Sequence, residues 1–140
     1  MTFEDLPKNW TALPLTDPAL AADVVDLLLS CADRALSSLL FLPCSAEGIG
    51  YPRPVIIGGM DWHCAAVERD RTLRSLGQSG AASAVLAVSA PHRLPPGLVR
   101  SWHTAAHDEL AAEGMRLLGF CSADPDTVFI HSPADARRAA

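Results

Sequence analysis

The sequence predicts one α/β (α+β) domain built on a mixed sheet of about five strands. Its 140 residues fall within the size of a single domain, and 49% of them are apolar, which is enough for one core. Short apolar runs predict buried strands, and they alternate with stretches in which apolar residues recur every three or four positions, as in helices. The expected order is α-β-β-α-β-α-β-β over residues 17–132, between an extended arm, 1–16, and a flexible tail, 133–140.

The first helix is predicted to begin at Pro18, because Thr16 or Asp17 can cap it and proline fits its first turn. We expect it to run to about Ser30. The apolar run 36–42 then predicts a buried strand.

Residues 53–57 predict the hairpin partner of that strand, across a turn rich in glycine. Asp61 is expected to cap a second helix that runs to about Leu76 and buries Trp62. Residues 81–89, which are nearly all apolar, predict a central strand.

The third helix is predicted over residues 98–113, with Gly114 as its stop. Two closing strands follow at 115–122 and 126–131, joined by an Asp-Pro turn. A strand, helix and strand in one sheet form a parallel crossover, so the third and fourth strands should be parallel. The flanking hairpins make the sheet mixed.

Composition excludes several function classes. The formal charge of −5 argues against a protein that binds DNA or RNA through clustered Lys and Arg. No basic and apolar signal segment opens the chain, and apolar runs such as 81–88 are too short to span a bilayer. The expected location is therefore the cytoplasm, with reduced thiols and no membrane partner.

Two histidines, His103 and His107, stand one helical turn apart, as metal ligands often do. In zinc proteases the residue after the first histidine is a glutamate that activates water, but here it is Thr104. On a helical wheel His103 borders the apolar face and His107 points to water, so a pair of surface imidazoles is favoured over a metal pair.

Two further histidines, His63 and His92, stand at junctions between strands, loops and helices, where the active sites of α/β proteins gather. An alternative hypothesis places a metal site on His63, His92 and His103, with Asp61 in reserve, for a hydrolase or deaminase. Against it stands the simpler interpretation that these are loop histidines bonded to nearby carbonyl groups.

Two carboxylates, Glu109 and Glu113, fall on the nominally apolar face of the third helix. A carboxylate in such a place must be paired, capped or shifted in its pKa. Arg69 occupies a similar place on the second helix, so we expect an ion pair between Arg69 and Glu109 rather than a catalytic acid.

None of the four cysteines stands at metal or redox spacing from another, and buried inert thiols are expected at Cys31, Cys44, Cys64 and Cys121. Cys64, beside His63 near a helix start, has the best route to a lowered pKa, so a thiol enzyme is a third hypothesis.

The three tryptophans are expected to anchor the arm and two helices to the sheet. They are Trp10, Trp62 and Trp102. An exposed Trp10 or Phe3 would instead mark a surface for a partner.

Residues 114–120, followed by 126–131, resemble the closing part of a RadC-type JAB/MPN domain, a metalloprotease-like fold. Residues 39–44 and 53–57, with the turn at Glu47-Gly48, resemble its opening hairpin. The chain is also similar to a small actinobacterial group that shares three motifs, here Leu6-Pro7-Lys8-Asn9-Trp10, Trp102-His103 and Leu117-Leu118-Gly119.

The zinc motif that this resemblance implies does not carry over. A JAB site has His-x-His at the end of the third strand and a later Asp, but the chain reads Ser89-Ala90-Pro91-His92 and then Leu98-Val99. A cytidine-deaminase-like fold, the second resemblance, needs His-x-Glu and Pro-Cys-x-x-Cys. The chain offers His63-Cys64-Ala65 and Pro95-Pro96-Gly97 at those places.

The sequence therefore predicts a non-catalytic binding or regulatory module on a degenerate JAB-like fold. No catalytic, cofactor-binding or metal residue is assigned, and no cofactor is expected. A homodimer through a sheet edge or the arm, or an unknown protein partner, would fit such a module. The alternative is the metal-dependent hydrolase or deaminase described above.

Overall fold

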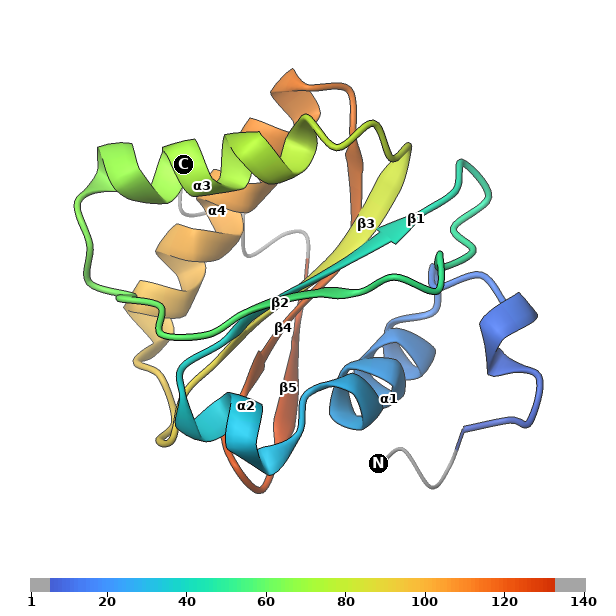
Figure 1. Cartoon of the computed structure of the whole chain (residues 1–140), viewed down its shortest axis with the longest axis horizontal. Coiled ribbons are helices and arrows are strands. Elements are labelled where there is room, and N and C mark those ends of the chain that lie inside the picture. The colour runs from blue at the N-terminus through green and yellow to red at the C-terminus, as the bar shows by residue number, and fades with distance from the viewer. Residues whose placement is uncertain (1–5, 133–140) are drawn as a thin grey trace.

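A computed structural model describes residues 6–132 of the chain, and it contains one mixed five-stranded sheet with strand order β2-β1-β3-β4-β5. Figure 1 shows α1 and α2 on one side of this sheet and α3 and α4 on the other. The elements are α1 (Pro18–Leu28), α2 (Cys31–Ala35), β1 (Leu39–Cys44), β2 (Val55–Ile57), α3 (Ala66–Gly77), β3 (Ser83–Ser89), α4 (Pro96–Ala112), β4 (Arg116–Ala123) and β5 (Val128–His131). The predicted fold class is confirmed.

The central strand is β3, and all seven of its residues are buried. It pairs antiparallel with β1 and parallel with β4, while β2 and β5 lie antiparallel at the two edges. The parallel crossover through α4 and both hairpins are therefore confirmed. As predicted, Gly114 follows α4, and its φ of 78° explains the choice of glycine there.

One helix was not predicted from the sequence. The first helix ends at Leu28, and α2 begins directly after Ser30. Ser30 accepts a hydrogen bond from the Asp33 N–H, and the Asp33 carboxylate accepts one from the Ser30 N–H. This reciprocal cap starts α2, so the predicted strand over 36–42 is displaced: Leu36 is 62% exposed and β1 begins three residues later.

The start of α3 was also predicted wrongly. Asp61 does not cap the helix; its side chain accepts a hydrogen bond from the His63 N–H at 3.0 Å, which closes a local turn. The helix begins at Ala66, and Trp62 is buried from the preceding loop.

The sheet separates two cores. The core between the sheet and the helices α3 and α4 includes Phe41, Leu86 and Phe120 together with both buried tryptophans. The core between the sheet and α1 includes Val24 and Val85, and the half-buried Trp10 packs against it.

The part of the arm that is described, residues 6–16, contains a short 3-10 turn, Trp10–Ala12, and a bridge between Pro14 and Ile49. Phe3 and the predicted tail, 133–140, lie outside the described residues. No helix among those described is both long and apolar enough to cross a bilayer.

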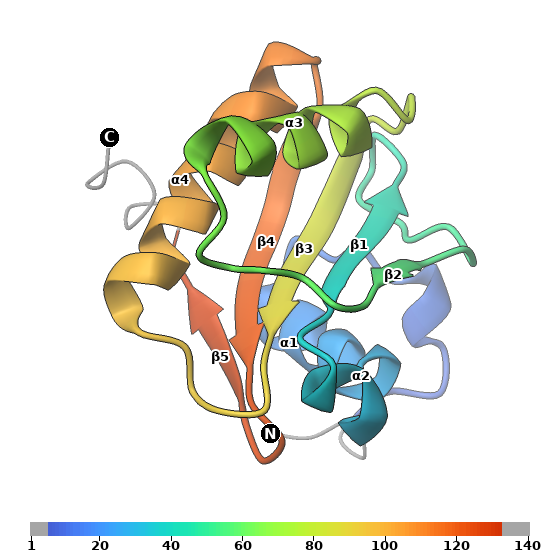
Figure 2. The same ribbon diagram turned by 60° about the vertical axis from the view of Figure 1, so that its left-hand side comes forward.

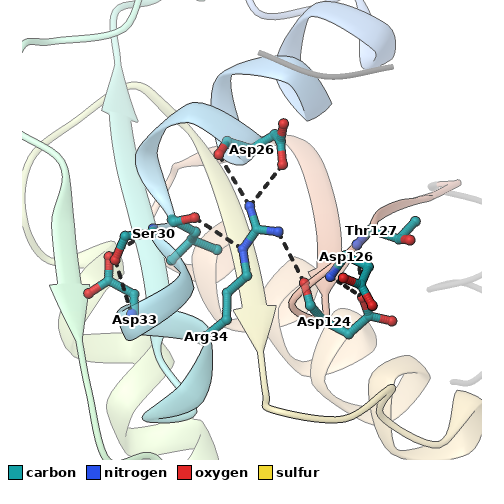
Figure 3. Close-up of polar contacts among 8 residues, drawn as sticks. Asp26, Ser30, Asp33, Arg34, Asp124, Asp126 and Thr127 are labelled. Carbon is teal, nitrogen blue, oxygen red and sulfur yellow. Dashed lines mark hydrogen bonds and ion pairs between the residues drawn. The ribbon is translucent and has the colours of Figure 1, made fainter. Parts of the chain in front are cut away.

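Arg34 joins α1, α2 and the turn between β4 and β5 (Figure 3). Its guanidinium, on a side chain only 4% exposed, donates to the carbonyls of Leu29, Asp26 and Asp124 and to the Asp26 carboxylate at 2.9 Å. Asp124 in turn accepts from the N–H groups of Asp126 and Thr127. Because these groups satisfy one another, α1 is held in a fixed position against the β4–β5 hairpin.

Candidate functional site

The end of β3, where the resemblance would place a metal, is filled by two tryptophans. The Trp62 indole donates to the Ser89 carbonyl at 3.0 Å, and the Trp102 indole donates to the Trp62 carbonyl at 2.9 Å. Their rings meet edge to face with centroids 5.0 Å apart. The prediction that Trp62 and Trp102 anchor their segments is confirmed, and both indoles are buried.

The three histidines of the alternative metal site are not brought together. His63 is exposed before α3, His92 is exposed after β3, and His103 is buried on α4. Within residues 6–132 no three His, Cys, Asp or Glu side chains are grouped so that they could hold a metal ion.

The expectation of two surface imidazoles on α4 is wrong for His103. This residue is only 3% exposed, and its ring stacks on Phe120 of β4 with centroids 4.5 Å apart and planes 9° apart. The stacking partner explains why an imidazole at the border of the apolar face turns inward. His107 is exposed as expected, and its Nδ1 lies 3.2 Å from the Asp108 carboxylate.

Sequence reasoning missed a third imidazole. His131 of β5 is paired in register with Phe120, and its Nε2 lies 2.8 Å from the Ser122 Oγ. Its ring centroid is 6.4 Å from that of His103. Every second residue of a strand points to the same face of the sheet. Applied to the two closing strands, this alternation could have identified His131 and Ser122.

The carboxylates of α4 pair differently from the prediction. Glu109 accepts from Arg74 at 3.1 Å, whereas Arg69 is paired with Asp70 at 2.9 Å. An ion pair therefore joins α3 to Glu109 of α4, as predicted, but its arginine is Arg74 and not Arg69. Glu113 is exposed.

The thiol hypothesis is weakened by electrostatics. Burial, together with the negative charges of Glu68 and Asp61, raises the pKa of Cys64, which is the opposite of what a nucleophile at neutral pH needs. Cys31 is exposed, contrary to expectation, while Cys44 and Cys121 are buried as predicted.

Within residues 6–132, only half of the outer edge of β4 is covered. β5 pairs with the stretch from Phe120 to Ala123, so the β4 residues from Arg116 to Gly119 have no described partner on that side. Figure 2 shows β5 ending part-way along β4, with α4 in front of the sheet and α1 behind it. A bulge interrupts the pairing with β3 at Leu118, so Leu118 and Gly119 both face α1.

A cavity of about 360 Å³ lies at this open edge. It is lined by five consecutive β4 residues, 117–121, whose side chains point to both faces of the sheet. The cavity therefore opens onto the edge of the strand and not onto one face. Its remaining walls come from α1, from α4 and from the end of β5, as Thr16, Pro18, Ala21, His103, His107, Ile130, His131 and Ser132.

A second, larger cavity of about 560 Å³ lies between the arm and the β1–β2 loop. Its walls include Trp10, Tyr51, Pro52 and Pro54, and among the described residues that line it there is no histidine, carboxylate or amine. The cavity at β4 combines backbone edge, apolar walls and three imidazoles, so it is the better candidate for specific binding.

Comparisons of the chain with models of known families, with curated proteins and with solved structures find no match.

Proposed function

We propose that this chain is a non-catalytic binding module, on a scaffold of the degenerate JAB type, that takes up an extended segment of a partner protein at the open edge of β4. The observation that carries the proposal is the edge-on cavity along residues 117–121, in line with the end of β5. A strand placed there would complete the sheet by main-chain hydrogen bonds.

The dimensions of the gap support a short extended segment. Residues 116–119 of β4 are the unpaired part of an eight-residue strand, and strands rise by about 3.3 Å per residue, so the gap is about 13 Å long. Side chains of an added strand alternate in direction. They would enter the two halves of the cavity, one toward α1 and one toward α4.

The closed end of β3 supports a binding role over an enzymatic one. Ligands of α/β sheets usually bind at the carboxyl ends of the parallel strands. Here Trp62 is 5% exposed and Trp102 is 2% exposed, and both indole N–H groups are hydrogen-bonded to backbone. A ligand at the end of β3 would have to displace these two indoles and expose them to solvent.

The test uses the full chain and a synthetic peptide, acetyl-Thr-Val-Glu-Val-Thr-amide, followed by amide NMR. We expect shifts at residues 116–119 and at His107, with none at Val55–Ile57, the opposite edge of the same sheet. No shift at millimolar peptide, or equal shifts at both edges, would contradict the proposal.

Two other occupants are distinguished by controls. If the peptide binds only to a variant that ends at Ser132, the chain's own last residues occupy the edge and the proposal fails. If sedimentation shows a dimer whose dissociation accompanies peptide binding, a second copy is the occupant, and the partner is this same chain.

A further inference from the structure

We infer that the cavity between the arm and the β1–β2 loop binds a proline-rich segment of a partner protein in the polyproline II conformation (Figure 1). The cavity has a volume of about 560 Å³ and is lined by leucines of the core on the α1 side. The inference goes beyond the proposed function, because it concerns a different surface and a ligand of different conformation. It is carried by two aromatic side chains whose polar groups have no partner.

The lining of this cavity is apolar, with a buried floor and a more exposed rim. Leu15 and Leu42 are buried, and a β-carbon added at Gly50 would lie 3.5 Å from a methyl carbon of each. Proline rings pack well on aromatic side chains, and grooves lined by aromatic residues are the usual sites for proline-rich segments. The rim consists of aromatic and proline rings, from Trp10, Tyr51, Pro52 and Pro54.

Trp10 differs from the other two tryptophans in its hydrogen bonding. The indole N–H groups of Trp62 and Trp102 both donate to backbone carbonyls. Neither the Trp10 indole N–H nor the Tyr51 hydroxyl has a hydrogen-bond partner among residues 6–132. Two side-chain donors of the rim are therefore left for a ligand to satisfy.

A proline-rich segment complements an apolar cavity with donors on its rim. Proline has no N–H, and in the polyproline II conformation the backbone carbonyls make no internal hydrogen bonds. Such a segment offers acceptors to the two donors and apolar rings to the floor. Another extended segment would bring backbone N–H groups, and each of them loses its water on entering an apolar cavity.

The backbone holds both aromatic residues in place before a ligand binds. The Tyr51 N–H donates to the Pro43 carbonyl at 2.9 Å, and Pro52 fixes its own φ directly after it. On the arm, the Trp10 carbonyl accepts from the Leu13 N–H at 3.1 Å and closes the 3-10 turn. Because the walls and the polyproline II segment are both preformed, binding costs little ordering entropy.

The test titrates the full chain with acetyl-hexaproline-amide and follows the three indole Nε1–H signals by NMR. We expect the signal of Trp10 to shift. The signals of Trp62 and Trp102 should stay, because both indoles are buried in the core on the other face of the sheet. The variant Trp10→Phe identifies the Trp10 signal by its loss.

Two variants each remove one donor and keep an aromatic ring. Trp10→Phe and Tyr51→Phe are each expected to weaken binding roughly fivefold, read from the amide signal of Gly50. Leu36→Ala, at an exposed apolar residue outside the cavity, is the matched control and should bind the peptide unchanged. Gly50→Val adds a side chain to the floor at a position without positive φ and should abolish binding, once circular dichroism shows that it folds.

Unchanged Trp10 and Gly50 signals at millimolar hexaproline would overturn the inference, and so would unweakened binding in both donor variants. Binding only to Phe3→Ala would make residues 1–5 of the chain the occupant, and a dimer that hexaproline dissociates would make it a second copy; either result contradicts the inference. A response of Trp10 to hexanol and not to hexaproline would point to a small apolar ligand and overturn it as well.

The peptide acetyl-Thr-Val-Glu-Val-Thr-amide separates this inference from the proposed function. It should shift residues 116–119 and leave the Trp10 indole signal unchanged. Loss of the first response with a normal response to hexaproline would refute only the proposed function, and the reverse pattern would refute only this inference.

Discussion

The end of β3 and the outer edge of β4 lie on neighbouring strands and differ in what fills them. At the end of β3 two indoles pack edge to face and satisfy their N–H groups on backbone carbonyls. At the edge of β4 the neighbouring strand stops after four pairs and leaves a cavity with imidazoles on one wall. The topology of the fold favours a ligand at the end of β3. Of these two regions, however, the edge of β4 is the one that has a cavity.

The largest loss of stability should come from removing an indole at the end of β3. Trp102→Ala removes a side chain that is 2% exposed and is expected to lower the free energy of unfolding by about 3–5 kcal/mol. Urea denaturation measures it. His107→Ala, on the exposed part of the same helix, is the control and should change stability by less than about 0.5 kcal/mol. Similar losses in the two variants would refute the contrast between the two regions.

Removal of Arg34 should loosen the wall that α1 gives to the cavity. Arg34→Met leaves the carbonyls of Leu29 and Asp124 without their buried donor, and we expect a loss of about 3 kcal/mol in unfolding free energy. Arg69→Met, which breaks a half-exposed ion pair within α3, should cost much less. A neutral Arg34 variant would show that the network does not hold α1 in place.

The buried thiols predict a loss of stability at high pH. Burial raises the pKa of Cys44 from 9.0 to about 11 and that of Cys121 to about 12. Because the folded-state pKa values lie above the unfolded value, the stabilisation is complete below about pH 9 and is lost as the pH rises through the folded values. Unfolding free energy should fall by roughly 2 kcal/mol for each of the two thiols by about pH 11. The double variant Cys44→Ala, Cys121→Ala should flatten that decline, and an unchanged slope would contradict this origin.

The smallest stability effect concerns the imidazole that the sequence analysis missed. Ser122→Ala removes the hydroxyl that lies 2.8 Å from the His131 Nε2 and is expected to cost about 1 kcal/mol. Thermal or urea unfolding measures the cost, and NMR of the histidine ring shows whether His131 reorients. An unchanged His131 spectrum would mean that Ser122 does not fix this ring.

Much of the fold could be predicted because its signals are local. The apolar run of β3, the hairpin turns and Gly114 each reflect a period or a conformation that a few residues determine. The short helix α2 was not predicted, because its cap, Ser30 with Asp33, interrupts an apolar pattern that by itself resembles a longer strand. The start of α3 was misplaced because Asp61 forms a turn and not a cap.

The candidate site could not be predicted in the same way. It depends on where β5 ends relative to β4, and this register is set by the hairpin turn that Asp124 and Arg34 hold. The burial of His103 likewise depends on Phe120, a residue of another strand. Both are consequences of tertiary pairing, which no local period contains.

Amide hydrogen exchange on the free protein tests whether the edge of β4 is open. We expect fast exchange for those amides among residues 116–119 that point away from β3, and slow exchange across residues 120–123, which β5 covers. Uniform slow exchange along the whole of β4 would mean that the edge is already covered, and it would contradict an open site there.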